Sequence, residues 1–160
     1  MTDWHSKFSN FEIITSWEKY KNPDKPRLKL NEYRHVKINF KLYLEVKTQK
    51  PGIAFLCNIK YFDLIKNYTW SSQKPNFKSR NYSYYIQTRY KNSKFSFHQM
   101  VYPEWSCIDH INRNGLDNRE INLRDGSNGV NNLNCSLQKN NLSGYNGISF
   151  SKFHNSWRFR

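Results

Sequence analysis

The sequence predicts a mixed α+β protein in which strands outnumber helices. Residues 36–46 alternate apolar and polar side chains without a break, which is the period of a strand with one buried face. Residues 81–91 are rich in tyrosine and residues 94–98 carry two phenylalanines, with a polar turn between them, so they predict a hairpin. Apolar residues at helical spacing occur only in short stretches, and we therefore expect few and brief helices.

The chain divides into four predicted parts, of which the first is a basic N-terminal extension. In this extension Phe11, Ile14 and Trp17 have the spacing of one face of a short helix. A basic, proline-interrupted connector follows at residues 21–29. The predicted parts are the extension (1–35), a β-rich region packed on the core (36–106), the core (107–140) and a C-terminal hairpin (141–160).

The β-rich region contains further elements after the alternating segment. Residues 36–46 themselves are long enough for one strand or a bent pair of strands. After a turn, residues 53–57 form a short apolar run typical of a buried strand. Residues 58–68 have inward-facing apolar positions at helical spacing, and Asn58 is placed to cap that brief helix.

The charge balance indicates a polyanionic partner. The chain has 26 Lys and Arg against 12 Asp and Glu, a formal net charge of +14. Such a surface attracts nucleic acid and has little use in an enzyme of small neutral substrates. We expect the partner to be double-stranded DNA. Because tyrosines can stack on unpaired bases, an RNA-binding module is the alternative.

Cysteine usage and hydropathy limit the compartment. The three cysteines show no CxxC spacing and therefore indicate neither a disulfide framework nor a zinc ribbon. No apolar run approaches the roughly 20 residues of a membrane span. The N-terminus lacks the apolar centre of a signal peptide. We expect a soluble, intracellular protein without a membrane partner.

The residues richest in chemistry lie in the stretch CIDHINRNGLDNREINLRDGSNGVNNLN, residues 107–134. Its pattern predicts a strand at 107–111, a polar loop, a second strand at 122–124 and a short helix that begins near residue 127. Asp109 and His110 are neighbours on the first strand, so their side chains point to opposite faces. The carboxylate could hold a metal while the imidazole reaches a water molecule.

The run DHINRNGLDNREINLR resembles the core of the HNH homing endonucleases. That family carries a ββα-metal (His-Me finger) element, which binds one divalent cation and cuts a phosphodiester. The resemblance implies that Asp109 and Asn131 are the metal ligands, with the adjacent Asn132 as the alternative helical ligand. It further implies catalytic roles for His110, as the general base, and for Asn122, which would brace the loop and orient the imidazole.

The resemblance predicts a cofactor, an activity and a product. Carboxylate and amide oxygens suit one Mg²⁺ or Mn²⁺ ion. We therefore expect a metal-dependent DNA endonuclease of HNH homing type that hydrolyses a phosphodiester. The alternative is a catalytically inactive HNH-like DNA-binding or regulatory protein. One metal site cuts one strand at a time, and no obvious dimer patch is visible, so we expect a monomer that nicks duplex DNA.

Basic residues in the core and at the C-terminus are the expected DNA contacts. Residues 148–150 and 157–159 predict the two strands of a hairpin. The start of this hairpin resembles the first strands of the DNA-binding domain of ethylene-response factors, which often follows an HNH core. The candidate DNA-binding residues are Arg113, Arg119, Arg124, Arg158 and Arg160.

His98 is the remaining histidine near the core. It begins the short helical stretch HQMVY, which ends at Pro103. Because it is well separated from Asp109 along the chain, we expect a structural, hydrogen-bonded histidine. A catalytic or metal-binding role is the alternative.

Overall fold

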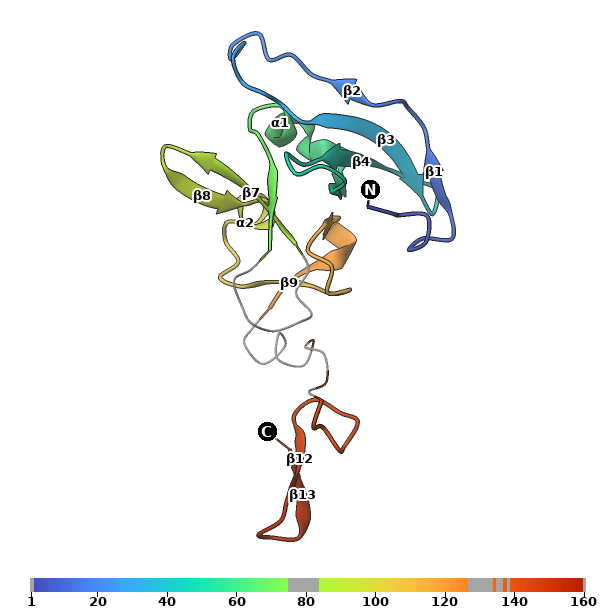
Figure 1. The fold of residues 1–160 in the computed structure, drawn as a ribbon, viewed down its shortest axis with the longest axis vertical. Coiled ribbons are helices and arrows are strands. Elements are labelled where there is room, and N and C mark those ends of the chain that lie inside the picture. Colours follow the sequence, from blue (N-terminus) through green and yellow to red (C-terminus); the bar gives the residue numbers. More distant parts are fainter. Residues whose placement is uncertain (1, 75–83, 127–133, 135–136, 138, 160) are drawn as a thin grey trace.

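The computed structural model has a mixed α+β fold dominated by strands, as the sequence predicts (Figure 1). Its two α-helices in the described part of the chain are α1 (Phe62–Ile65) and α2 (Phe97–Val101). Among the described residues, no helix is long and apolar enough to cross a membrane. The structure describes residues 2–74, 84–126, 134, 137 and 139–159.

The largest sheet has six strands and includes part of the predicted core. Five strands follow the order β1-β3-β4-β5-β10, and β2 also pairs with β3. All these pairs are antiparallel except that of β10 with β5, which is parallel. Through β10, the polar loop of the predicted core joins the main sheet. The strands are β1 (Phe11–Ile13), β2 (Glu18–Lys19), β3 (Glu32–Ile38), β4 (Lys41–Lys47), β5 (Ala54–Asn58) and β10 (Asp117–Asn118).

The alternating segment forms the hairpin β3–β4 rather than one strand. Asn39 and Phe40 at its turn have φ of 48° and 65°, as a tight hairpin turn requires. Val36 and Leu44 are buried as predicted, but Phe40 and Leu42 are 84% and 50% exposed. The expectation of a continuous buried face was wrong at these two positions because the turn interrupts the alternation.

The N-terminal residues belong to the sheet and its core. The helix expected over residues 11–17 is wrong, because β1 pairs with β3 and brings Phe11 opposite Ile38. Three apolar positions are a weak helical signal, and pairing with a long strand overrides it. Trp4 is buried in the main core, and the predicted boundary between residues 35 and 36 falls inside β3.

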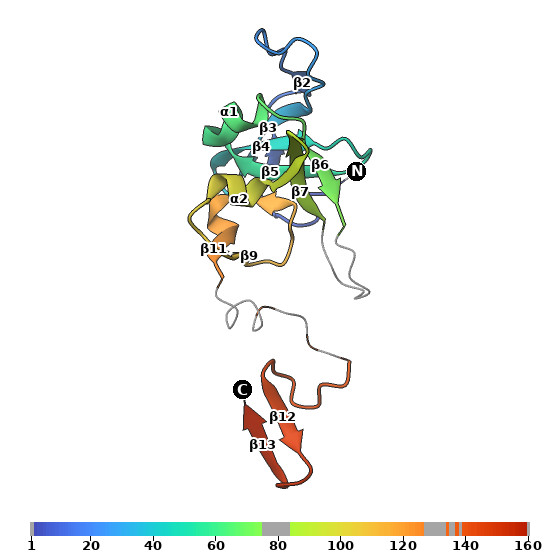
Figure 2. The same cartoon turned by 90° about the vertical axis from the view of Figure 1, so that its left-hand side faces the viewer.

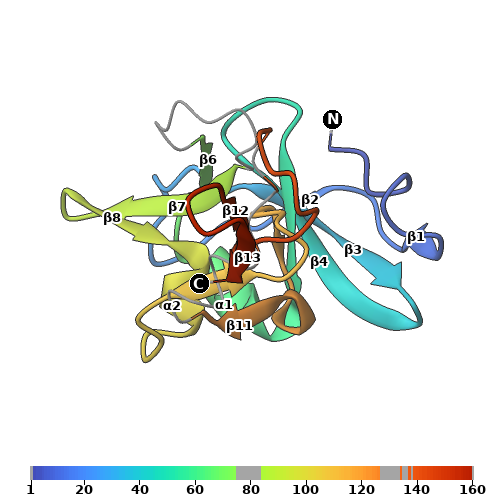
Figure 3. The same ribbon diagram turned by 90° about the horizontal axis from the view of Figure 1, so that it is seen from below.

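The second sheet contains the predicted tyrosine-rich hairpin. It has the order β6-β7-β8, with Lys91 and Asn92 at positive φ in the turn between β7 and β8. Figure 3 shows this hairpin projecting on the side of the molecule opposite to β3–β4. Helix α2 follows directly and carries His98. The strands are β6 (Ser71–Gln73), β7 (Tyr85–Tyr90) and β8 (Ser93–Ser96).

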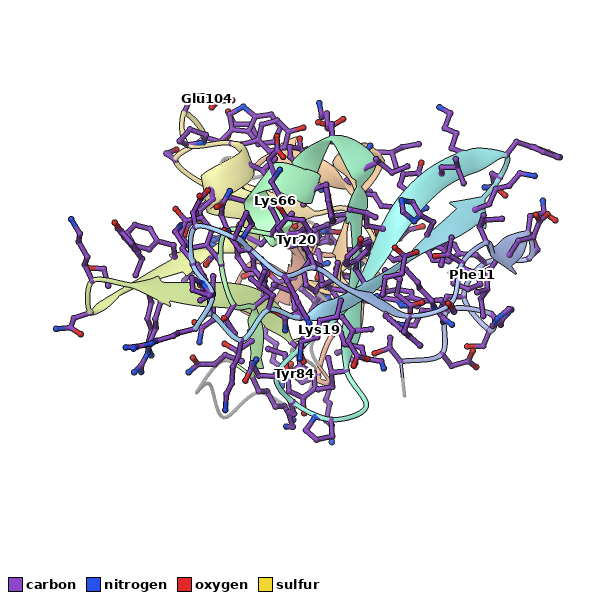
Figure 4. All side chains as sticks on the ribbon, turned by 90° about the horizontal axis from the view of Figure 1, so that it is seen from above. Phe11, Lys19, Tyr20, Lys66, Tyr84 and Glu104 are labelled. Atoms are coloured by element: carbon purple, nitrogen blue, oxygen red, sulfur yellow. The ribbon has the colours of Figure 1, made fainter. Side chains whose placement is uncertain are left out.

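The brief helix predicted after β5 is present as two short turns. A 3₁₀ turn, η1 (Ile59–Tyr61), leads into α1. Asn58 makes no capping hydrogen bond with its side chain; instead its Oδ1 accepts the backbone N–H of Glu120 at 2.9 Å. Tyr20 lies beside α1, where the Lys66 ammonium is 5.8 Å from its ring centroid (Figure 4).

Three fully buried aromatic rings connect the two sheets with α2. The ring centroid of Phe97 lies 5.3 Å from that of Phe55 and 5.1 Å from that of Trp70. Such tilted and edge-on pairs stabilise beyond the burial of their area. Because Phe97 is the first residue of α2, this cluster fixes the helix and the adjacent His98 against the main sheet.

Two small antiparallel sheets complete the structure. The two predicted core strands are β9 (Ile108–His110) and β11 (Leu123–Asp125), which pair with each other. The 3₁₀ turn η2 (Glu120–Asn122) leads directly into β11. The helix expected from residue 127 lies outside the described residues. The predicted C-terminal hairpin is present, with Ile148 opposite Phe159, and lies apart from the large sheet (Figures 1 and 2). Its strands are β12 (Ile148–Ser151) and β13 (Ser156–Phe159).

Gly115 provides a test of how the core loop packs on the second sheet. A Cβ at this position would lie 2.5 Å from the carbonyl oxygen of Tyr84 and 2.9 Å from Cδ1 of Tyr85. We expect Gly115→Ala to push the loop away and to lower the free energy of unfolding by about 1–3 kcal/mol. Urea unfolding measures the change. A variant as stable as the wild type would show that this close approach is absent in solution.

Candidate metal and acid–base site

Asp109 and His110 lie side by side at the end of β9, and both are nearly buried. Their side chains are 7% and 4% exposed. The pairing of β9 with β11 places Arg124 opposite Asp109 and Leu123 opposite His110. The two residues singled out by the sequence therefore share one strand of a short sheet, and both are buried there.

The oxygens of Asp109 form part of a convergent cluster. The side-chain nitrogen of Asn134 lies 2.9 Å from both carboxylate oxygens of Asp109 and 2.9 Å from the carbonyl oxygen of His110. Three oxygens, two from the carboxylate and one from the backbone, thus surround the position of the Asn134 amide nitrogen. Arg124 approaches the carboxylate as well, with Nε 2.9 Å and Nη2 2.7 Å from Oδ2.

Gly126 allows the backbone to pass close to this cluster. A Cβ at position 126 would lie 3.0 Å from the Cβ of Asp109. The N–H of Gly126 donates to the carbonyl oxygen of Cys107 at 2.9 Å, which continues the β9–β11 pairing by one residue. A larger residue here would press on the carboxylate that forms the centre of the site.

The imidazole of His110 is held by Asn118, a fully buried residue of β10. Asn118 Oδ1 lies 3.2 Å from His110 Nε2, while Asn118 Nδ2 donates to the carbonyl oxygen of Gly115 at 3.1 Å. Because the amide nitrogen is already used, the amide oxygen faces the ring. This favours the tautomer with the proton on Nε2, which leaves Nδ1 able to accept a proton.

Burial keeps His110 neutral. Removal from water lowers the pKa of His110, and this effect outweighs the opposing influence of the Asn118 hydrogen bond and of the charges of Asp117 and Asp109. An unprotonated imidazole can act as a base at neutral pH.

His98 packs against the His110 ring without bonding to it. The two ring centroids are 5.2 Å apart and the rings are perpendicular, and Tyr85 lies 5.9 Å from each. Burial, together with repulsion from His110 when that ring is protonated, lowers the pKa of His98 to about 4. Within the described residues, its Nδ1 has no hydrogen-bond partner. The neutral His98 ring thus lines the site and packs against Tyr85 and His110, and in the described part of the chain its Nδ1 lacks the hydrogen bond expected of a structural histidine.

Both polar atoms of the Asn122 side chain form hydrogen bonds within the loop. Its Oδ1 accepts the N–H of Asn112 at 2.9 Å, and its Nδ2 donates to the carbonyl oxygen of Asp117 at 2.7 Å. The resemblance assigned the orientation of the imidazole to Asn122, but the ring donates from Nε2 to Oδ1 of Asn118 instead.

The predicted DNA-binding arginines have different surroundings. Arg119 is buried, makes two hydrogen bonds of 2.7 and 2.8 Å to the carboxylate of Asp117, and lies over the ring of Phe8; this arrangement favours a structural role. Arg113 is exposed next to the site, and Arg158 is exposed on β13. Three predicted positions, Asn131, Asn132 and Arg160, lie outside the described residues.

Two functional candidates were not predicted from the sequence. Asn118 and Asn134 are amides in an asparagine-rich stretch, where the sequence gives little reason to prefer one over another. Across the described residues, His, Cys, Asp and Glu side chains do not gather in groups of three that could hold a metal. Any cation here would therefore depend on amide and backbone oxygens in addition to Asp109.

Comparison with known proteins adds no family to this description. No protein-family model, curated protein or solved structure matches the chain.

The buried His98 predicts a specific dependence of stability on pH. Its pKa of about 4 in the folded protein lies below the ordinary value of 6.5, so the unfolded chain binds the proton more readily. Its contribution is complete above pH 6.5 and is lost as pH falls toward 4. A shift of this size corresponds to about 3 kcal/mol. We expect His98→Phe to lose less stability over this range than the wild type.

Urea unfolding at several pH values between 4 and 7 measures this difference. The matched control is His154→Phe, which changes an exposed histidine. The control should keep the pH dependence of the wild type. If the free energy of unfolding changes with pH equally in the wild type and in His98→Phe, the pKa of His98 is not lowered in the folded protein.

Proposed function

We propose that this protein is a metal-dependent DNA endonuclease of HNH homing type. The observation that carries the proposal is the arrangement of Asp109 and His110. A neutral, buried imidazole oriented by Asn118 lies on one face of β9, and the carboxylate of the preceding residue, whose oxygens converge with a backbone carbonyl, lies on the other. This is the combination that metal-assisted hydrolysis of a phosphodiester requires.

The oxygen cluster fits a hard divalent cation. Carboxylate and carbonyl oxygens are the ligands that Mg²⁺ and Mn²⁺ prefer. Rotating the Asn134 carboxamide by half a turn would exchange its nitrogen for an oxygen, so Asn134 is a candidate ligand in addition to the proposed Asn131. A cation held there would supply charge stabilisation for the phosphate and the leaving oxygen.

His110 would act as the general base toward the attacking water. Its neutral ring accepts the proton, and the hydrogen bond to Asn118 keeps the ring oriented while this happens. The imidazolium that forms is stabilised by the negative charges of Asp117 and Asp109, which raise the pKa of His110 against the effect of burial.

DNA binding would come from the strongly basic surface. With a net charge of +14, most of the affinity would arise from Lys and Arg on phosphates. Arg113 and Arg124 are near the proposed cleavage site, and Arg158 would extend the contact along the C-terminal hairpin, while Arg160 is a proposed contact that lies outside the described residues. The internal pairing of Arg119 makes it the weakest of the five candidates.

The second candidate function is a noncatalytic HNH-like DNA-binding or regulatory protein. The ion pair between Arg124 and Asp109 favours it, because a guanidinium already neutralises the carboxylate that would hold the metal. Relaxation of a supercoiled plasmid with and without Mg²⁺ distinguishes the two functions.

The role of His110 can be tested by substitution. We expect His110→Ala to lower the cleavage rate by ~10² to 10⁴-fold, because the reaction loses its base, while affinity for DNA is retained. Single-turnover cleavage and an electrophoretic binding assay measure the two quantities. His154→Ala, which removes an exposed histidine, is the control. Cleavage by His110→Ala at the wild-type rate would exclude this residue as the base.

The product follows from having one proposed metal site per chain. The two strands of duplex DNA run in opposite directions. A cut in the second strand therefore needs a second active site, or release and rebinding of the protein. We expect a monomer that converts a supercoiled plasmid to open circles well before linear molecules form. Linear product from the start, at a rate rising with the square of protein concentration, would instead indicate a dimer.

A further inference from the structure

The Arg124 guanidinium binds a single oxygen of the Asp109 carboxylate through two of its nitrogens. Nε and Nη2 both donate to Asp109 Oδ2, and direct opposition in the β9–β11 pairing holds the two residues together. Asp109 is nearly buried, whereas the Arg124 side chain is 38% exposed. The guanidinium therefore lies between the carboxylate and solvent.

A divalent cation on Asp109 would change the position of this guanidinium. Two cations that share one carboxylate oxygen repel each other, and they do so more strongly near the protein interior than in water. The backbone of Arg124 is fixed in β11, but its long side chain is partly solvated and can turn outward without breaking the strand pairing. A guanidinium released in this way suits a phosphate, which it binds with two parallel hydrogen bonds.

We propose that Arg124 is an internal counter-cation that neutralises Asp109 in the metal-free protein and moves to a DNA phosphate when a divalent cation binds. This inference rests on the proposed function and adds a coupling between its two ligands. Metal and Arg124 compete for Asp109, whereas metal and DNA assist each other through Arg124. Coupling of this kind is reciprocal, so each ligand changes the affinity for the other by the same factor.

The competition predicts that removing Arg124 tightens metal binding. Mn²⁺ binding to the full chain without DNA can be measured from the loss of the free-ion electron paramagnetic resonance signal. We expect Arg124→Ala and Arg124→Gln to bind Mn²⁺ about threefold or more tightly than the wild type. A residue that only positioned Asp109 for the metal would give the opposite sign.

Two variants control this measurement. Arg89→Ala removes the same charge from an exposed position on β7 and should change the affinity less than Arg124→Ala does. Asp109→Ala should abolish Mn²⁺ binding at this site. Arg124→Ala or Arg124→Gln binding Mn²⁺ no more tightly than Arg89→Ala would overturn the inference.

The proposed cooperation between metal and DNA binding is tested with duplex DNA on a His110→Ala background, where the DNA stays intact. At constant ionic strength, Mn²⁺ should increase the affinity of this protein for DNA, and adding Arg124→Ala should reduce that increase at least about threefold. An equal increase in both proteins would overturn the inference.

The two proposals fail in distinguishable ways. If the wild type binds Mn²⁺ through Asp109 and Arg124→Ala does not tighten it, the coupling is wrong while the metal site stands. If neither the wild type nor the Arg124 variants bind Mn²⁺, the proposed metal site is wrong, and the role of Arg124 falls with it.

Discussion

The parallel pairing of the two-residue strand β10 with β5 determines the geometry of the candidate site. It inserts Asp117 and Asn118 into the main sheet, where both are fully buried. Buried polar groups are costly unless they are hydrogen-bonded, and these two bond to Arg119, Asn112 and the His110 ring. The loop that carries the chemistry is consequently held by the most buried part of the protein.

The two neighbouring residues of the site differ because their surroundings differ. His110 faces Asn118 and the rings of His98 and Tyr85, so burial lowers its pKa and leaves it neutral. Asp109 receives N–H donors from Arg124 and Asn134 on the other side of β9. Alternation along one strand therefore separates a proton acceptor from a cluster of oxygens suited to a cation.

Features that depend on local sequence were predictable, and those that depend on distant pairing were not. The β7–β8 turn and the β12–β13 hairpin follow from turn residues and short-range alternation. The residues around Phe11 were predicted as a helix from their apolar spacing. Their pairing with β3, which makes them a strand, is nonlocal and leaves no local signal. Likewise, only the β10–β5 pairing decides that Asn118, and not Asn122, reaches the imidazole.

Crystals grown with Mn²⁺ would test the central claim most directly, because anomalous diffraction locates the ion independently of activity. The arrangement of oxygens predicts a peak bonded to the Asp109 carboxylate, on the same side as the carbonyl oxygen of His110 and the Asn134 side chain. Distances of about 2.0–2.2 Å to the oxygens are expected for a cation of this size. Fully occupied Mn²⁺ sites elsewhere, with none at Asp109, would contradict the claim.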